Sequence, residues 1–130
     1  YASHTNFGPT PEEFARRSSV LAEHCREVGT DFDAIVRSTN RFVVCRATER
    51  EVQEELAAIA DRYRRVVPEE QAERATAMYR EMAGTPEQLV ERLRPWADAG
   101  LGYAIIYFPD AAYDSTDLEL FAREVVPAFT

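Results

Sequence analysis

The second half of the chain, from Gly84 to Phe129, constrains the fold more than any other part of the sequence. It reads as helix, strand and helix, with a start or stop signal at each junction. Gly84-Thr85-Pro86 predicts a helix start, because Thr caps well and Pro suits the first helical position. Ala99-Gly100 predicts the end of that helix. The next segment, Tyr103–Phe108, is apolar on both faces, which is typical of a buried parallel strand.

The first half of the chain carries the same kinds of helix start and stop signals. Thr10 and Pro11 predict the start of a helix, and Glu13 is expected to close a capping box with Thr10. The apolar face of this helix continues to about Val28, where Gly29 is expected to end it as a left-handed cap residue.

Strand and helix signals also fill the ends and the middle of the chain. Residues 1–6 read as the last part of a strand, and residues 32–44 contain a second strand rich in β-branched and aromatic side chains. The polar run 38–41 predicts that this strand is bulged or shorter than the window. Thr48 opens a helix with a clear apolar stripe, and Pro68 separates it from a weaker one.

This order of helices and strands predicts an α/β fold in one domain, residues 1–130. Alternating helices and strands favour parallel pairing with right-handed crossovers, here few strands and helix-rich crossovers. The residues on the apolar stripes and strands that are expected to be buried are Phe14, Leu21, Val43, Leu56, Ile59, Leu93, Trp96, Ile105, Ile106, Phe121 and Val125.

Composition excludes several classes of function. The net charge of −8 argues against nucleic-acid binding and disfavours anionic membrane surfaces. No apolar run approaches the ~18 residues of a membrane span, and no secretory signal is visible. Cys25 and Cys45 lack metal-site spacing and are expected to be buried free thiols of a cytoplasmic protein.

No catalytic constellation stands out, but four residues are candidates for binding. If residues 1–6 end a barrel strand, His4 and Asn6 reach the active-site mouth; a frayed terminus is the alternative. Arg46 follows a strand and could contact a phosphate or carboxylate, or lie on a solvated loop. Thr85 opens a helix and could help bind a phosphate, or cap the helix and do no more, and Glu87 would repel an anion.

Metal sites are not expected. His24 and Cys25 are adjacent helical residues, so they point about 100° apart and do not share a face. Asp110, Asp114 and Asp117 lack the spacing and the glycine of a calcium loop, and are interpreted as turn and cap residues.

Several motifs together resemble the C-terminal end of the luciferase-like flavin and deazaflavin (F420) oxidoreductases, which are (β/α)8 barrels. Ala2–Asn6 looks like the ending of the family's sixth strand, although Ser3 and Thr5 replace an Asp and a Trp. Cys25–Gly29 looks like a Cys-x-x-x-Gly helix end, and Gly84–Gln88 looks like the start of the eighth unit.

The resemblance implies about the last three β/α units of a TIM barrel, since a whole barrel typically needs ~250 residues. The longer parent protein would be an F420- or FMN-dependent oxidoreductase or monooxygenase with a small-molecule substrate, and His4, Asn6, Arg46 and Thr85 would be the cofactor-binding candidates here. Most ring contacts would lie upstream, so this chain alone is expected to bind neither cofactor tightly and to be inactive.

Two further expectations concern the chain as a whole. The alternative to a barrel segment is a free-standing small α/β module for binding or scaffolding, without catalysis. Because Tyr103–Phe108 carries no charge and a partial barrel leaves strand edges open, a homo-oligomer is expected.

Overall fold

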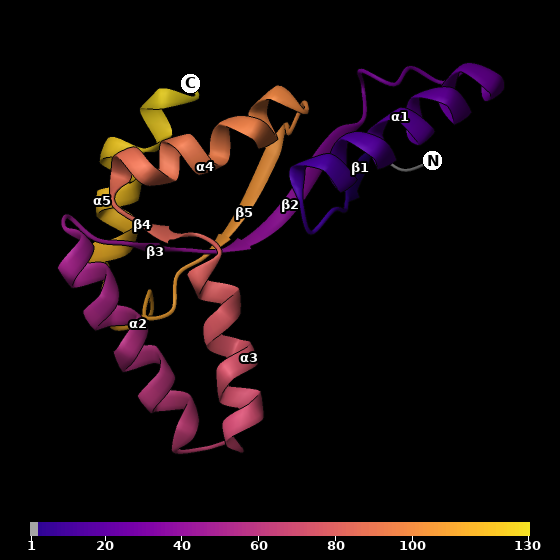
Figure 1. Ribbon diagram of the computed structural model, residues 1–130. Coiled ribbons are helices and arrows are strands. Elements are labelled where there is room, and N and C mark those ends of the chain that lie inside the picture. Colours follow the sequence, from indigo (N-terminus) through magenta and orange to yellow (C-terminus); the bar gives the residue numbers. More distant parts are fainter. Residues whose placement is uncertain (1–2) are drawn as a thin grey trace. The chain divides into compact units, whose positions relative to one another are not determined.

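The computed structural model describes residues 3–130, so Tyr1 and Ala2 of the first strand motif lie outside the described residues. Within that range the fold is α/β, with five α-helices and five short strands (Figure 1). The elements in order are β1 (His4–Asn6), α1 (Pro11–Val28), β2 (Val36–Phe42), β3 (Val44–Cys45), α2 (Glu49–Arg64), α3 (Glu69–Arg80), β4 (Ala83–Gly84), α4 (Pro86–Asp98), β5 (Tyr103–Tyr107), α5 (Thr116–Glu124) and the 3-10 turn η1 (Val126–Ala128).

The chain forms two compact units. The first unit consists of residues 1–40 and 93–105, and the second of residues 41–92 and 106–130. Three elements, β2, α4 and β5, begin in one unit and end in the other.

The strands belong to two sheets. The larger has the order β1-β2-β5, and β1 is parallel to β2, with Asn6 opposite Ser38. The smaller pairs β3 with β4, also in parallel, with Val44 opposite Ala83. The predicted α/β class with short parallel strands is therefore confirmed, and the described residues do not close a barrel. The amino-acid sequence does not reveal β3 and β4 as separate strands, because two-residue strands carry no periodic signal.

Helix α1 begins and ends where the sequence predicts. Thr10 Oγ1 accepts a hydrogen bond from Glu13 N at 3.2 Å, and Gly29 takes the left-handed conformation with φ 71°. The capping box expected at Glu13 is wrong, because its carboxylate binds Arg16 and Arg17 at 2.7 Å each. Helix α2, by contrast, begins after Thr48 as predicted and has a complete capping box between Thr48 and Glu51.

The core of the first unit is built on Phe14, which is fully buried. Its ring lies 5.2 Å from that of Phe7 and 5.8 Å, edge-on, from that of Trp96. Gly8 adopts φ +90° against the backbone of Phe14: a Cβ there would stand 2.9 Å from the N, Cα and Cβ atoms of Phe14, so no other residue fits without displacement.

The core of the second unit lies where the α2–α3 hairpin meets the β3–β4 pair (Figure 1). Phe108 and Phe121 add an edge-on aromatic contact at 5.6 Å. The buried residues that form the main cluster are Val44, Val52, Leu56, Ile59, Tyr79 and Ala83.

The predicted core is correct for eight of its eleven residues and wrong for Leu21, Ile105 and Ile106, which are only half-buried. Burial on both faces suits a strand between two neighbours, but β5 stands at the end of the sheet order. Val28, expected on the buried face of α1, is 73% exposed in the last turn.

Helix α5 buries Phe121 and Val125, as predicted, but Leu118, which was expected on the same inner face, is not covered. Leu118 is exposed, whereas Asp117, Leu120 and Phe121 are buried. The carboxylate of Asp117 is anchored to the backbone of Cys45, which fixes the rotation of the helix. No described helix is both long and apolar enough to cross a lipid bilayer.

Candidate functional site

A polar cluster lies on one face of β1 and β2 in the first unit. Asn6 Nδ2 donates to Ser38 Oγ at 3.1 Å and to Asn40 Oδ1 at 2.7 Å. Ser38 Oγ in turn donates to the carbonyl of Thr5 at 2.8 Å. We call Asn6, Ser38 and Asn40 the amide cluster. Its two amide side chains are exposed, whereas Ser38 is buried beneath them.

His4 shares the face of Asn6, because alternate residues of a strand point to the same side. Its Nδ1 lies 3.0 Å from Ser3 Oγ, and its side chain is exposed. The prediction that residues 1–6 are the last part of a strand is confirmed for residues 4–6. The structure thus brings the candidates His4 and Asn6 together on one face.

The candidate Arg46 follows β3 in the second unit and is surrounded by carboxylates. Its Nη2 lies 2.9 Å from Glu55 Oε2 and 3.9 Å from Asp114 Oδ2, and its Nε lies 3.4 Å from Asp117 Oδ1. The Arg46 side chain is only 12% exposed. Its charge is therefore already compensated, and an incoming anion would have to displace one of these groups.

The network continues from Glu55 to the loop after β5. Glu55 Oε1 accepts from Arg62 Nη2 at 3.0 Å, and the same nitrogen lies 3.1 Å from Asp110 Oδ2. Acidic and basic groups thus alternate from Asp117 through Arg46, Glu55 and Arg62 to Asp110. We call these five residues the charge network.

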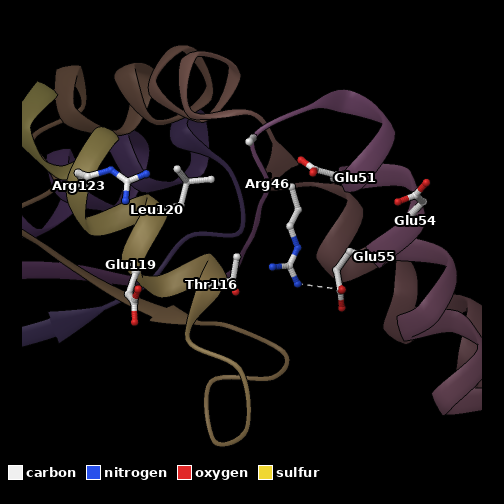
Figure 2. Close-up of a pocket in the computed structure, with 9 residues that line it drawn as sticks. Arg46, Glu51, Glu54, Glu55, Thr116, Glu119, Leu120 and Arg123 are labelled. Atoms are coloured by element: carbon white, nitrogen blue, oxygen red, sulfur yellow. Dashed lines mark hydrogen bonds and ion pairs between the residues drawn. The ribbon is translucent and has the colours of Figure 1, made fainter.

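A pocket of about 560 Å³ opens over this network, between the N-terminal half of α2 and one side of α5 (Figure 2). Arg46 lies between Glu55 and Thr116 in this view. The residues that line the pocket are Arg46, Ala47, Glu51, Glu54, Glu55, Thr116, Glu119, Leu120 and Arg123. Four of the nine are acidic and two are basic, so an anionic cofactor group would meet net repulsion there.

Burial shifts two pKa values in this region. Desolvation raises the pKa of Asp117 to about 6, although Arg46 and the hydrogen bond from Cys45 N oppose the shift. Desolvation, with Asp117 and Glu124 nearby, raises the pKa of the Cys45 thiol to about 12. Cys45 is therefore a protonated core residue rather than a nucleophile. Both cysteines are free and buried, as predicted.

Thr85, the fourth candidate, directs its polar groups to its own helix. Its hydroxyl bonds Glu87 Oε2 at 3.0 Å, and its backbone N–H donates to Gln88 Oε1 at 3.1 Å. Gln88 also donates to Glu49 at 2.8 Å, which ties the start of α4 to the start of α2. A phosphate at this helix start would compete with Glu87 for the same donors.

Sequence reasoning missed Ser38, Asn40, Glu55 and Asp117. Ser38 and Asn40 lie within the polar run 38–41, which predicts a bulged or shortened strand rather than a binding face. Ser38 lies two residues after Val36, and Asn40 lies two residues before Phe42. Because alternate residues of a strand point to the same side, this spacing places all four side chains on one face of β2. Asp117 was interpreted as a cap residue, and nothing local in the sequence shows that it reaches Cys45.

Comparisons with known proteins bear on the fold. No protein-family model matches the sequence, and no curated protein matches it either. The coenzyme F420-dependent tetrahydromethanopterin reductase from Methanopyrus kandleri matches 100% of the chain, with a TM-score of 0.66 and 16% identity. An F420-dependent secondary alcohol dehydrogenase, solved with an F420–acetone adduct, matches 98% of it, with a TM-score of 0.62 and 15% identity.

The shared property is the fold. At this identity the likeness extends no further, but it confirms the fold expected from the resemblance. The chain spans less than half the length of these proteins, 46% of the reductase and 42% of the dehydrogenase.

Proposed function

We propose that this chain is the C-terminal part of a luciferase-like, F420-dependent oxidoreductase that acts on a small molecule. The observation that carries the proposal is that two F420-dependent proteins share the fold over 98–100% of the chain. The polar residues at the carboxyl end of β1 support it, because active sites of such barrels lie at that end of the strands.

The described residues suit a neutral planar ring better than a phosphate. The amide cluster offers uncharged hydrogen-bonding groups on an open strand face. Arg46 and Thr85, in contrast, are engaged by carboxylates. Asn6, with His4 beside it, would therefore contact the cofactor ring or the substrate. Arg46 and Thr85 remain weaker candidates for binding the charged tail of the cofactor. A bound deazaflavin or flavin would supply hydride transfer.

F420 is the favoured cofactor because both structural neighbours are named for it. The alternative cofactor is FMN, and with FMN the activity would be that of a monooxygenase. Fluorescence titration of a protein that carries this chain within a complete barrel distinguishes them. We expect a dissociation constant near micromolar or below for F420 and weaker binding of FMN. Tight binding of FMN alone would reverse the choice of cofactor, and binding of neither would overturn the proposal.

The 130-residue chain by itself serves as the comparison in that titration. We propose that it binds neither cofactor tightly, because the resemblance places most ring contacts outside it. Near-micromolar binding of F420 or FMN to the chain alone would show that the site is contained in these residues.

We also propose that the chain self-associates. Tyr103 and Tyr107 of β5 are exposed, and a second copy could cover them. Sedimentation at micromolar concentration tests this proposal. A dimer supports it, and a clean monomer contradicts it.

A further inference from the structure

The hydrogen-bond directions in the amide cluster are fixed by one backbone carbonyl. The carbonyl of Thr5 can only accept, so the single proton of the Ser38 hydroxyl is committed to it at 2.8 Å. Ser38 Oγ must then accept from Asn6, which means that the Asn6 atom 3.1 Å away is its nitrogen. The second N–H of that nitrogen points to Asn40, whose facing atom at 2.7 Å must be the oxygen.

This series of hydrogen bonds leaves one acceptor atom and one donor atom of the two amides unused. Both protons of Asn6 Nδ2 are committed, so Asn6 presents its Oδ1 as an acceptor. Asn40 Oδ1 is committed, so Asn40 presents both protons of its Nδ2 as donors. Among residues 3–130, neither of these two atoms has a hydrogen-bond partner. The two amides are hydrogen-bonded to each other, and both side chains are exposed on the same face of the sheet.

We propose that Asn6 and Asn40 bind the edge of a planar lactam or imide, a group with a carbonyl next to an N–H. The ligand N–H would donate to Asn6 Oδ1, and its carbonyl would accept from Asn40 Nδ2. A carboxylate or phosphate fits poorly, since it has no proton for Asn6 Oδ1 and meets no cation in the cluster. This inference deepens the proposed function and rests on it in one respect: the pyrimidine ring of a deazaflavin or flavin carries such an edge.

The position of the pair favours a binding role over a purely structural one. Asn is depleted in strands, so strand propensity does not account for two exposed Asn side chains on adjacent strands. The buried member, Ser38, is only 6% exposed and holds Asn6 in one orientation before any ligand arrives. Such preorganisation reduces the entropy lost on binding.

The chain offers a clean test, because Asn6 and Asn40 are its only two asparagines. Side-chain labelling with [15N]asparagine therefore gives two NH₂ signal pairs in a heteronuclear NMR spectrum of the 130-residue chain. Succinimide is the probe, because it carries an imide edge and little else. N-methylsuccinimide is its matched control, because methylation removes the N–H that Asn6 Oδ1 would accept.

We expect both NH₂ pairs to shift saturably with succinimide. N-methylsuccinimide should bind roughly 5-fold or more weakly, the effect of one lost hydrogen bond. Asn40→Asp keeps the oxygen that accepts from Asn6 but removes the donor, so the Asn6 signals of this variant should no longer respond. Gln53→Glu, the same change at an exposed position of α2, should leave the response intact.

Three results would overturn the inference: no shift with succinimide, an equal shift with the methylated control, or an unchanged response in a folded Asn40→Asp chain. These outcomes are separable from those of the proposed function. F420 binding to a complete barrel without a succinimide response at Asn6 and Asn40 removes this inference alone. A succinimide response together with no binding of F420 or FMN removes the proposed function alone.

Discussion

Arg46 Nε lies 3.4 Å from Asp117 Oδ1, and the same oxygen accepts a hydrogen bond from Cys45 N at 2.9 Å. One carboxylate from the first turn of α5 is thus bonded to two consecutive residues at the end of β3. Its side chain is only 4% exposed, so its ionisation is coupled to folding.

Stability should depend on pH through Asp117. Its pKa rises from the usual 3.8 to about 6 because burial disfavours the charged form, and Glu55 and Asp114 add to the effect. The folded state then binds the proton more tightly than the unfolded state does. The contribution is fully present below pH 3.8 and is lost as pH rises through 6. A rise in pKa from 3.8 to about 6 corresponds to about 3 kcal/mol of stability in full.

Asp117→Asn isolates this contribution, because the amide keeps an oxygen to accept from Cys45 N but does not ionise. Urea unfolding of both proteins from about pH 4 to about pH 7 should show the native chain losing about 2–2.5 kcal/mol relative to the variant, because the unfolded carboxyl is already partly ionised at pH 4. Parallel pH profiles for the two proteins would show that Asp117 titrates normally.

Removing the cation at the centre of the charge network should be costly. Arg46→Met leaves Glu55 and Asp117, with side chains 13% and 4% exposed, without their main partner. The expected loss is about 3–5 kcal/mol in chemical denaturation at neutral pH. Arg50→Met breaks the exposed pair with Glu54 and should cost about 0–1 kcal/mol. Equal losses in the two variants would mean that Arg46 does not hold the network together.

Truncation of two apolar residues should distinguish the buried helix from the half-covered strand. Phe121 is buried and packs edge-on against Phe108, so Phe121→Ala should cost about 3–5 kcal/mol. Ile105 is only half-buried, so Ile105→Ala should cost less, about 1–2 kcal/mol. Thermal or urea unfolding measures both. A larger loss at Ile105 would indicate that β5 is covered in solution, for example by a second copy of the chain.

Two glycines with positive φ should differ in their tolerance of alanine. Gly29, at φ 71°, has open space where a Cβ would stand, so Gly29→Ala should cost about 1–2 kcal/mol for conformation alone. Gly8, at φ +90°, would also bring its Cβ within 2.9 Å of Phe14. Its replacement by alanine should therefore cost clearly more than that of Gly29, as measured by unfolding under the same conditions. Equal costs would show that Phe14 moves aside freely.

The parts of the fold that the sequence predicted are those encoded by local chemistry. Thr10, Thr48 and Gly29 mark helix ends through their own side chain or backbone, and each has the predicted role. Burial of β5 was not predictable from its apolar residues, because it depends on which strands flank it. The pair β3–β4 was missed for the same reason, since Val44 and Ala83 meet only in the folded chain.

The candidate site shows the same division. His4 and Asn6 were found because a strand ending in polar residues is a local pattern. Asn40 lies 34 residues from Asn6 along the chain. It joins the site only because β2 pairs with β1. Asp117 lies 72 residues from Cys45, and no sequence window joins them.

The most direct test of the proposed function is a crystal structure, with F420 bound, of a protein that contains this chain within a complete barrel. The proposal predicts a deazaflavin ring at the carboxyl ends of β1 and β2, with its pyrimidine edge within hydrogen-bond distance of Asn6 and Asn40. A ring bound elsewhere, or no binding of F420 at saturating concentration, would contradict it.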